Sequence, residues 1–390
     1  MPPAGRPRAL VACASFKGTL SARAAGEALA AGLRDRGWET VTQPLSDGGE
    51  GLVEVLAANA PGAGLVRVPC RGPLGERRWA RFALLPPTPR RPRLTAVLET
   101  AASSGLTLVP LRRRDPKFTT TLGLGDQVRE ALDRGAREIL LGLGGSASND
   151  GGAGLVQALG VHLRDERGRE LAPGGAALLR LARVDASGLD ARLRRVRVTA
   201  VCDVRNPLCG KRGASAVFGL QKGATPRDVA LLDRALRHWA AVVERGLGVR
   251  AANLPGAGAA GGLGFGCVAF LRARLRPGAE LVAAELGLEA LAAGAQLVIT
   301  GEGRLDRTTL LGKAPAGPAA RARRLGLACV AVGGGVESGA RRRLARLFAR
   351  VEDLAEFAGS EEEAMRRPAL WLRRLARARA EEWQALGGGP

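Results

Sequence analysis

Short apolar runs alternate with amphipathic stretches along the chain, which is the pattern of an α/β protein. The first apolar run, residues 10–14, leads into a turn at residues 15–18. Ser21 then caps a stretch with helical periodicity to about residue 36. A second run, residues 39–43, precedes a glycine-rich turn and another helical stretch. This β-α-β-α order predicts an open parallel sheet, whose ligands bind at the carboxyl ends of the strands.

Residues 138–154 combine a buried strand, a glycine-rich turn and a helix start. Backbone N–H groups of such a turn approach an oxyanion closely, and the helix dipole favours negative charge there. Ser146, Ser148 and Asn149 add neutral donors, and Asp150 adds a carboxylate suited to a hard cation. A capped strand-to-helix turn is the simpler interpretation of this stretch alone. It is not a P-loop, because no Lys-Ser or Lys-Thr follows the glycines.

The rest of the chain extends the α/β pattern. Strands are expected among residues 65–98 and at 196–202, 296–300 and 327–332, and helices at 119–133, from Thr225-Pro226 to about residue 245, and from Glu361. A second glycine-rich stretch, residues 255–266, is either a flexible loop with close helix packing or a ligand contact. The last helix is interpreted as a packing or dimer surface, so a homodimer is left open.

Charge and composition argue against several classes of protein. The formal net charge is +22, yet only five of the 59 basic residues are lysine and the arginines are scattered through every segment. This composition indicates arginine-rich solvated surfaces rather than a nucleic-acid-binding patch. No apolar run is long enough for a membrane span. Six cysteines without a CxxC pair, and no signal peptide, favour a reducing, cytoplasmic location.

A lysine retained in such a chain marks a position where a compact ammonium is useful. Four of the five lie beside glycine: Lys17, Lys211, Lys222 and Lys313. A point charge on phosphate or carboxylate is the functional interpretation. Chance retention is the alternative, and we expect it first for Lys117.

Carboxylates follow predicted strands in glycine-rich turns at four places: Asp47, Asp150, Asp203 and the pair Glu302 and Asp306. Any one of them alone is explained as a turn-former. Together with the lysines, they are the parts that hold Mg²⁺ and phosphates in phosphoryl transfer. His162, in a predicted strand, and His238, in the middle of a predicted helix, suit neither a catalytic triad nor a zinc site.

Seven short motifs occur in one order over residues 8–335. They are Ser15-Phe-Lys-Gly18, Asp47-Gly-Gly-Glu-Gly51, Gly144-Gly-Ser-Ala-Ser-Asn-Asp-Gly-Gly152, Cys202-Asp-Val-Arg-Asn-Pro-Leu-Cys-Gly210, Gln221-Lys-Gly-Ala-Thr-Pro226, Gly258-Ala-Ala-Gly-Gly262 and Gly301-Glu-Gly-Arg-Leu-Asp306. Jointly they resemble the motifs of the type-1 glycerate kinase family, over nearly the whole chain.

The resemblance implies phosphorylation of D-glycerate with ATP and Mg²⁺, to 2-phosphoglycerate in bacterial members. It also implies a Rossmann-like or flavodoxin-like parallel-sheet domain made from both ends of the chain, with a second α/β domain inserted and the active site in the cleft. In this chain we expect residues 1–70 plus 286–390 to form the first domain and residues 71–285 to form the second.

The mechanistic hypothesis is in-line transfer of the γ-phosphoryl group to a glycerate hydroxyl. Asp203, or as second choice Asp150, accepts the hydroxyl proton or orients the hydroxyl, while Lys17 and Lys222 neutralise phosphate or the substrate carboxylate. The candidate metal ligands are Asp47, Asp150 and Asp203. The candidates for binding substrate or phosphate are Ser15, Asp47, Glu50, Ser146, Asn149, Asn206, Glu302, Asp306 and Lys313, of which Glu302 and Asp306 are expected to close the site from the other domain.

The chain departs from the family pattern at three places. Ala14 stands where the family has Asp, Leu122 replaces a Tyr, and Arg307-Thr308 replaces Gly-Gln. An impaired or repurposed member that binds nucleotide or another small hydroxy acid is therefore the alternative. A nucleic-acid-binding protein is a third hypothesis, which predicts a steep salt dependence of DNA binding.

Overall fold

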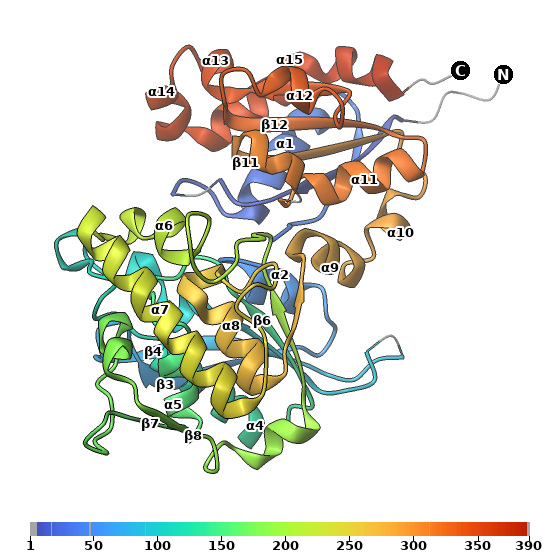
Figure 1. Cartoon of the computed structure of the whole chain (residues 1–390). Helices are drawn as coiled ribbons and strands as arrows, with labels where there is room; N and C mark the ends of the chain where they lie inside the picture. Colours follow the sequence, from blue (N-terminus) through green and yellow to red (C-terminus); the bar gives the residue numbers. More distant parts are fainter. Residues whose placement is uncertain (1–5, 17, 47, 90, 312, 388–390) are drawn as a thin grey trace. The chain divides into compact units, whose positions relative to one another are not determined.

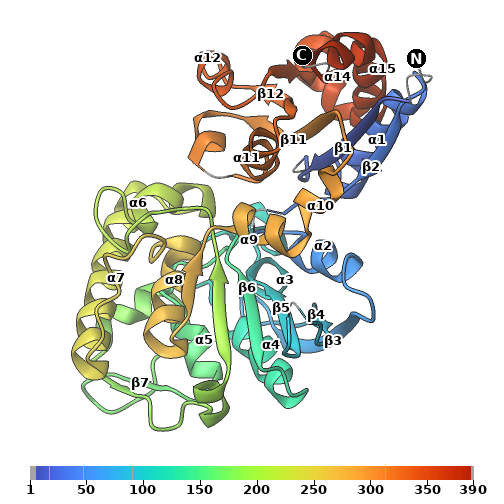
Figure 2. The same cartoon turned by 90° about the vertical axis from the view of Figure 1, so that its right-hand side faces the viewer.

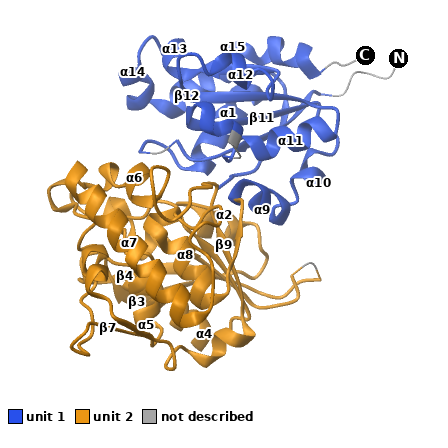
Figure 3. Ribbon diagram, viewed as in Figure 1, with its two compact units in different colours: residues 1–47, 278–390 blue, residues 48–277 orange. Residues whose placement is uncertain are grey.

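The computed structural model describes residues 6–16, 18–46, 48–89, 91–311 and 313–387. The chain forms two compact units (Figure 3). Unit 1 comprises residues 1–47 and 278–390, and unit 2 comprises residues 48–277. Both ends of the chain thus build one unit, and the continuous middle builds the other.

The division between the units falls 23 residues before the first expected boundary, 47/48 against 70/71, and 8 residues before the second, 277/278 against 285/286. Residues 64–71 belong with unit 2 because β3 (Gly64–Arg71) pairs with β4 (Arg77–Leu85) along its whole length. Residues 278–285 belong with unit 1 because α9 (Gly278–Glu285) packs on α11 (Ala316–Arg324), where the guanidinium of Arg321 donates to the carbonyl of Glu280.

Unit 1 contains a five-stranded sheet in which all strands are parallel (Figure 1). Its order is β13 (Arg350–Asp353), β12 (Ala328–Val336), β11 (Leu297–Leu305), β1 (Arg8–Cys13) and β2 (Glu39–Thr42). Strand β1 and the first halves of β11 and β12 are almost continuously apolar and buried, as expected of parallel strands covered on both faces. The predicted Rossmann-like sheet is confirmed.

Two helices from opposite ends of the chain pack together in unit 1. They are α1 (Ala22–Arg34), capped by the Ser21 hydroxyl as predicted, and α15 (Pro368–Gly387). Their contact is close at Gly32, where a Cβ atom would lie 2.2 Å from the Arg373 carbonyl oxygen. Leu29, Leu33 and Trp383 join the same buried core. The two ends of the chain therefore form one folding unit.

Unit 2 contains a six-stranded mixed sheet, in which Figure 2 shows β6, β5, β4 and β3 side by side. The full order is β10 (Arg274–Arg276), β9 (Arg197–Val201), β6 (Glu138–Gly142), β5 (Thr95–Glu99), β4 and β3. The four strands from β10 to β5 are parallel, while β4 and β3 are antiparallel to their neighbours. The sheet order places β6 and its glycine-rich turn between β5 and β9.

Several helices cover the sheet of unit 2. The core includes Trp239 of α7 (Pro226–Leu247), which stacks on Phe270 and meets Phe265 edge-on, both in α8 (Ala259–Leu271). The remaining helices and strands of the chain are α2 (Leu52–Ala58), α3 (Thr100–Ser104), α4 (Leu122–Asp133), α5 (Ala153–Ala158), α6 (Ala214–Phe218), α10 (Leu288–Ala292), α12 (Arg341–Leu344), α13 (Leu354–Ala358), α14 (Glu361–Arg366), β7 (His162–Arg164) and β8 (Arg183–Asp185).

The glycine-rich residues 255–266 form a turn, a kink at Ala260, Gly261 and Gly262 where φ is positive, and then regular helix of α8, so the expectation of a flexible loop is wrong for residues 263–266. Close packing, the other part of that expectation, is present: a Cβ on Gly261 would lie 2.0 Å from the Ser148 carbonyl oxygen. Small residues here let α8 approach the turn after β6.

Within the residues that the structure describes, no helix combines the length and the hydropathy needed to cross a membrane.

We expect Gly32→Ala to destabilise the protein, because the new methyl group forces α15 away from α1. Overpacking of this kind costs about 1–3 kcal/mol. Gly246→Ala is the matched control: Gly246 lies in the last turn of α7, and no atom lies within 4 Å of the added Cβ, so a gain of up to about 1 kcal/mol is expected. Thermal unfolding followed by circular dichroism compares them, and a Gly32→Ala variant as stable as the wild type would contradict this packing.

Candidate functional site

The glycine-rich turn after β6 is held rigidly inside unit 2. The indole N–H of Trp239 donates to the Gly151 carbonyl at 3.1 Å. Gly151 itself has φ +62°, and a Cβ there would lie 2.5 Å from Trp239 Cδ1. Both the backbone conformation and the close approach require glycine at this position. The turn is therefore a preorganised element, as a binding loop must be.

Asp150 is fully buried at the end of this turn. Its Oδ2 accepts hydrogen bonds from the Thr121 N–H at 2.8 Å, the Thr121 hydroxyl at 2.9 Å and the Gly154 N–H at 3.2 Å, and its Oδ1 accepts from the Gly152 N–H at 3.2 Å. Burial raises the pKa of Asp150, and these donors oppose that rise. The carboxylate thus fastens α4 to the start of α5. This geometry lends no support to the predicted roles of Asp150 as base and metal ligand, which stay predictions.

Lys222 lies beside the same turn and is 3% exposed. Its Nζ donates to Ser146 Oγ at 2.9 Å and to the Ser148 carbonyl at 2.6 Å. Burial lowers the pKa of Lys222 to about 7, and the charge of Asp150 counteracts part of that shift. The structure therefore brings together Lys222 and Ser146, which the sequence predicted from separate motifs.

Asn149 is fully buried and donates from Nδ2 to the hydroxyl of Ser215 in α6 at 3.0 Å. Together with Lys222 and Ser146, it forms a compact group at the carboxyl end of β6. Ser215 was not predicted, because the motif in which Asn149 lies is 66 residues away in sequence. One cation and several neutral donors in a water-poor site suit an oxyanion.

The turn after Asp47 packs on the carboxyl ends of unit 2 strands. A Cβ on Gly142 would lie 2.4 Å from the Gly48 carbonyl oxygen, and a Cβ on Gly144 would lie 2.4 Å from Gly49 Cα. The paired glycines of the two turns thus allow one turn to rest directly on the other. Glu50, at the end of this turn, is exposed.

Glu99 is a further buried carboxylate that the sequence reasoning missed. It ends β5, is 8% exposed, and accepts hydrogen bonds from the Val53 N–H at 2.6 Å and from the Gly51 N–H. Burial raises its pKa to about 7 against the effect of these donors. Glu99 therefore ties the start of α2 to the sheet. In the sequence, the one feature that could have indicated Glu99 is its position as a carboxylate at the end of a predicted strand.

Asp203 and Asn206 follow β9, the strand next to β6. Asp203 is half-buried two residues after the end of β9. The Asn206 Nδ2 donates to the Arg212 carbonyl at 2.8 Å, and the Asn206 carbonyl accepts from the Gly258 N–H at 2.9 Å. Asn206 therefore shapes its own turn and joins it to the start of α8.

The predicted residues of unit 1 gather at the carboxyl ends of β1 and β11. Ser15 follows β1, and the adjacent Ala14 N–H donates to the Gly301 carbonyl of β11 at 2.8 Å. Beyond it, Lys313 Nζ lies 3.1 Å from Asp306 Oδ2, and the Thr309 hydroxyl donates to Glu302 Oε1 at 2.9 Å. Burial alone would raise the pKa of Asp306, but hydrogen bonds from Thr308 and Lys313 hold it below its usual value.

The departures from the family pattern have local structural roles. Ala14 is 7% exposed at the junction of β1 and β11, and Leu122 is buried at the start of α4. The Thr308 N–H donates to Asp306 Oδ1 at 2.7 Å, and the Arg307 N–H donates to Glu337 at 3.1 Å. Arg307 and Thr308 thus stabilise the turn that carries Asp306.

Among the other candidates, Lys117, for which chance retention was expected, pairs at 2.6 Å with Asp228, a residue in the capping box of α7. His162 contacts Glu170 and His238 contacts the Leu181 carbonyl, away from the predicted site residues. Lys17 and Asp47 lie outside the described residues.

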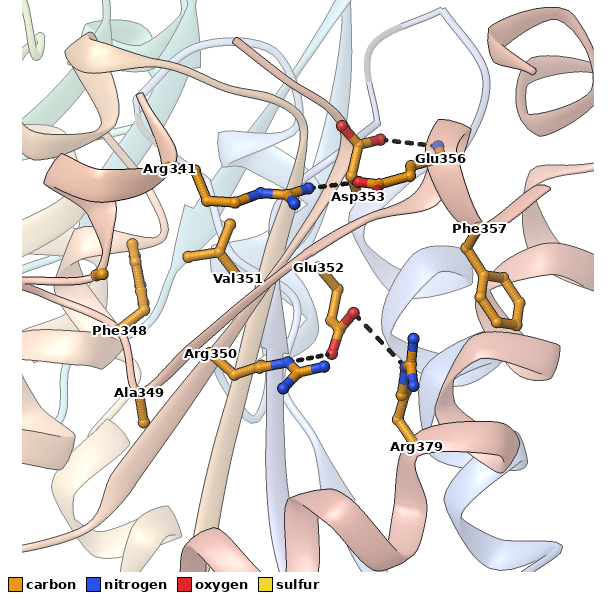
Figure 4. Close-up of a pocket in the computed structure, with 11 residues that line it drawn as sticks. Arg341, Phe348, Ala349, Arg350, Val351, Glu352, Asp353, Glu356, Phe357 and Arg379 are labelled. Carbon is orange, nitrogen blue, oxygen red and sulfur yellow. Dashed lines mark hydrogen bonds and ion pairs between the residues drawn. The ribbon is translucent and has the colours of Figure 1, made fainter. Parts of the chain in front are cut away.

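Unit 1 also contains a pocket of about 630 Å³ beside β13 (Figure 4). Its arginines and carboxylates neutralise each other: Arg350 lies 3.0 Å from Glu352, and Arg341 lies 2.6 Å from Glu356. None of the predicted site residues that the structure describes lines it. The pocket therefore adds nothing to the candidate site.

The comparisons with known proteins agree with each other. The model of the glycerate kinase family matches residues 9–384. The chain is 44% identical to the glycerate kinase of Bacillus subtilis strain 168 over 329 residues, which are 84% of this chain and 85% of the relative. It is 45% identical to the glycerate 2-kinase of Escherichia coli K12 over 312 residues, 80% of each chain. A crystal structure from Salmonella typhimurium LT2, designated glycerate kinase 2, has a TM-score of 0.79 at 42% identity and covers 97% of this chain and 99% of that chain.

The fold, the lysine- and hydroxyl-bearing turns and these matches define a phosphotransferase with an alcohol group as acceptor. More narrowly, the chain belongs to the glycerate kinase family.

We expect Asp150→Asn to lower stability, because an amide N–H would face a backbone or hydroxyl donor whichever way the side chain turns. The loss is expected to be about 2–4 kcal/mol. Denaturant unfolding measures it, with exposed Asp133→Asn as the control. A fully stable but inactive Asp150→Asn protein would contradict the structural role and restore Asp150 as a candidate base or metal ligand.

Proposed function

We propose that this protein transfers the γ-phosphoryl group of ATP to D-glycerate and forms 2-phosphoglycerate. The observation that carries the proposal is the buried Lys222 with Ser146 and Asn149, at the carboxyl end of the central strand β6. The names of the relatives from B. subtilis and E. coli supply the acceptor, and the latter supplies the phosphorylated position. Lysine and neutral donors in a buried site favour transfer between anionic reactants.

In this proposal Asp203 orients the acceptor hydroxyl and takes its proton as the phosphoryl group is transferred. Support comes from its place directly after β9, next to the β6 turn in the sheet order. General-base assistance of this kind contributes a factor of about 10²–10⁴ to a rate. Lys222 neutralises an anionic group of a reactant, and Ser146 and Asn149 orient that group. We propose that Lys17, Ser15, Glu50 and Asn206 contribute to binding.

The unit 1 residues Glu302, Asp306 and Lys313 are proposed to bind substrate or phosphate as a second group. This proposal is supported by the contacts that hold the two carboxylates in place. Asp306 is held by Lys313 and by the Thr308 N–H, and Glu302 is held by the Thr309 hydroxyl. A carboxylate and an ammonium held in place need little reordering when a ligand binds.

Mg²⁺ is proposed as the metal. Kinases hold it through one or two carboxylates and the substrate phosphates, rather than in a cage of protein ligands. The half-buried carboxylate of Asp203, two residues after the end of β9, fits this pattern. Asp203 of unit 2 would hold the ion, which when bound neutralises charge on the phosphates.

We also propose a reducing, cytoplasmic location. All six cysteines carry free thiols, and Cys13, Cys70, Cys267 and Cys329 are buried. Thiols are the stable form of cysteine in such a compartment.

Purified protein with ATP, Mg²⁺ and D-glycerate should release ADP in a coupled assay, and L-glycerate should not support release. Phosphorus NMR of the product should show 2-phosphoglycerate. ATP binding without turnover would overturn the proposal in favour of an impaired or repurposed member. Steeply salt-dependent DNA binding without turnover would instead favour the nucleic-acid hypothesis.

We expect Asp203→Asn to lower kcat by two orders of magnitude or more, because the hydroxyl loses its proton acceptor. Asp133→Asn, which alters an exposed carboxylate elsewhere in unit 2, should leave kcat within about twofold of the wild type. Steady-state kinetics at saturating ATP measures both. A smaller fall for Asp203→Asn, with the fold intact, would exclude Asp203 as the base.

A further inference from the structure

Lys222 is a buried cation whose ammonium contacts no carboxylate among the described residues. Its two hydrogen bonds go to a neutral hydroxyl and a neutral carbonyl, those of Ser146 and Ser148. The effect of Asp150 on Lys222 is a Coulomb interaction without a hydrogen bond, because the oxygens of Asp150 accept hydrogen bonds from backbone N–H groups and a hydroxyl. A buried charge without a partner is costly, which lowers the pKa of Lys222 to about 7, and an anion beside the ammonium would stabilise its charged form.

Two further polar atoms beside Lys222 are buried and, within the described part of the chain, have no hydrogen-bond partner. They are Ser148 Oγ and Asn149 Oδ1. The other end of the Asn149 amide is fixed by Ser215, so in either orientation of the group one buried amide atom is left to hydrogen-bond a ligand. Native proteins rarely leave such atoms unsatisfied, and a ligand is one explanation.

The hydroxyls near Lys222 can donate to an anion. Because Ser146 Oγ accepts the lysine N–H, its own hydrogen is available for a ligand. The ammonium has a third N–H beyond the two that the protein uses. The neighbouring Gly145, Gln221 and Gly223 are exposed, so the buried donors lie directly beneath surface residues.

We infer that Lys222, Ser146, Ser148 and Asn149 form the subsite for the carboxylate of the acceptor substrate, with Ser215 as the residue that positions Asn149. This inference rests on the proposed function. A single ammonium balances the one negative charge of a carboxylate, whereas the terminal phosphate of ATP carries about two and calls for a metal or further cations. The subsite therefore selects small hydroxy acids over uncharged polyols.

Carboxylate binding should draw a proton into the site. Among the groups around Lys222, the charge of Asp150 raises the pKa of the lysine. Helix α6 contributes the neutral hydroxyl of Ser215. The guanidinium of the nearby Arg114 donates a hydrogen bond to the Val109 carbonyl. With a pKa of about 7 in the empty site, the lysine is mostly neutral at pH 8. A bound anion favours the charged form and raises that pKa. Affinity should therefore fall as pH rises above 7.

Isothermal titration calorimetry with D-glycerate and, separately, with ATP tests the subsite without requiring turnover. Lys222→Met should weaken D-glycerate binding at least about 30-fold and change ATP binding less than about threefold. Lys117→Met, which removes a lysine paired with Asp228, is the matched control and should bind D-glycerate like the wild type. Glycerol, which lacks the carboxylate, should not bind to the wild type.

Loss of ATP binding with D-glycerate binding retained would overturn the inference and make the group a phosphate subsite. Unchanged binding of both ligands, or a wild type that binds ATP but not D-glycerate, would also overturn it. A wild type that binds D-glycerate without turnover would instead count against the proposed function alone.

Ser148→Ala serves if Lys222→Met does not fold, and it should weaken D-glycerate binding about 5–10-fold with ATP binding intact. Titrations at pH 8 in HEPES and in Tris, whose ionisation enthalpies differ, should reveal uptake of close to one proton per D-glycerate in the wild type. Binding heats independent of buffer would contradict the role of Lys222.

Discussion

The buried ammonium of Lys222 is the interaction on which this account depends. It joins the turn after β6 to the 3₁₀ turn that precedes α7, two segments 74–76 residues apart in sequence, through hydrogen bonds to Ser146 and Ser148. A charge in such a position is unfavourable unless something else in the site compensates it. Asp150, whose negative charge raises the pKa of Lys222, already accepts the hydrogen bonds that join α4 to α5. The protein thus holds a positive charge ready for a ligand and uses the turn's own carboxylate for its architecture.

The glycines of the site have a second purpose beside exposing backbone N–H groups. The turn after Asp47 rests on the turn after β6 because Gly142 and Gly144 have no side chains. Glu99 then fixes the start of α2 through the N–H groups of Gly51 and Val53. Turns that are far apart in sequence therefore pack directly on one another, and each turn restricts the conformation of the next. Because these turns are already ordered, little conformational entropy is lost when small anionic reactants bind.

Sequence reasoning predicted the local features well because their causes are local. The Ser21 cap, the Thr225-Pro226 helix start and the buried strand that opens residues 138–154 depend on neighbours within a few positions, and the structure confirms them. The family resemblance predicted the discontinuous parallel-sheet unit. The threonine partners of Asp150 lie 29–30 residues away, Val53 lies 46 residues from Glu99 and Ser215 lies 66 residues from Asn149, so no pattern in the motifs of these three residues could reveal those contacts. Residues 263–266 were misjudged because glycine content predicts a loop, whereas here it permits α8 to pack closely.

A crystal structure of the protein with D-glycerate and a non-hydrolysable ATP analogue would test the central claim most directly. The account predicts that the carboxylate of D-glycerate lies within hydrogen-bond distance of Lys222 Nζ and Ser148 Oγ, with the acceptor hydroxyl directed to Asp203. D-Glycerate bound in the pocket beside β13, near Arg350 and Arg379, with the Lys222 subsite unchanged, would contradict it.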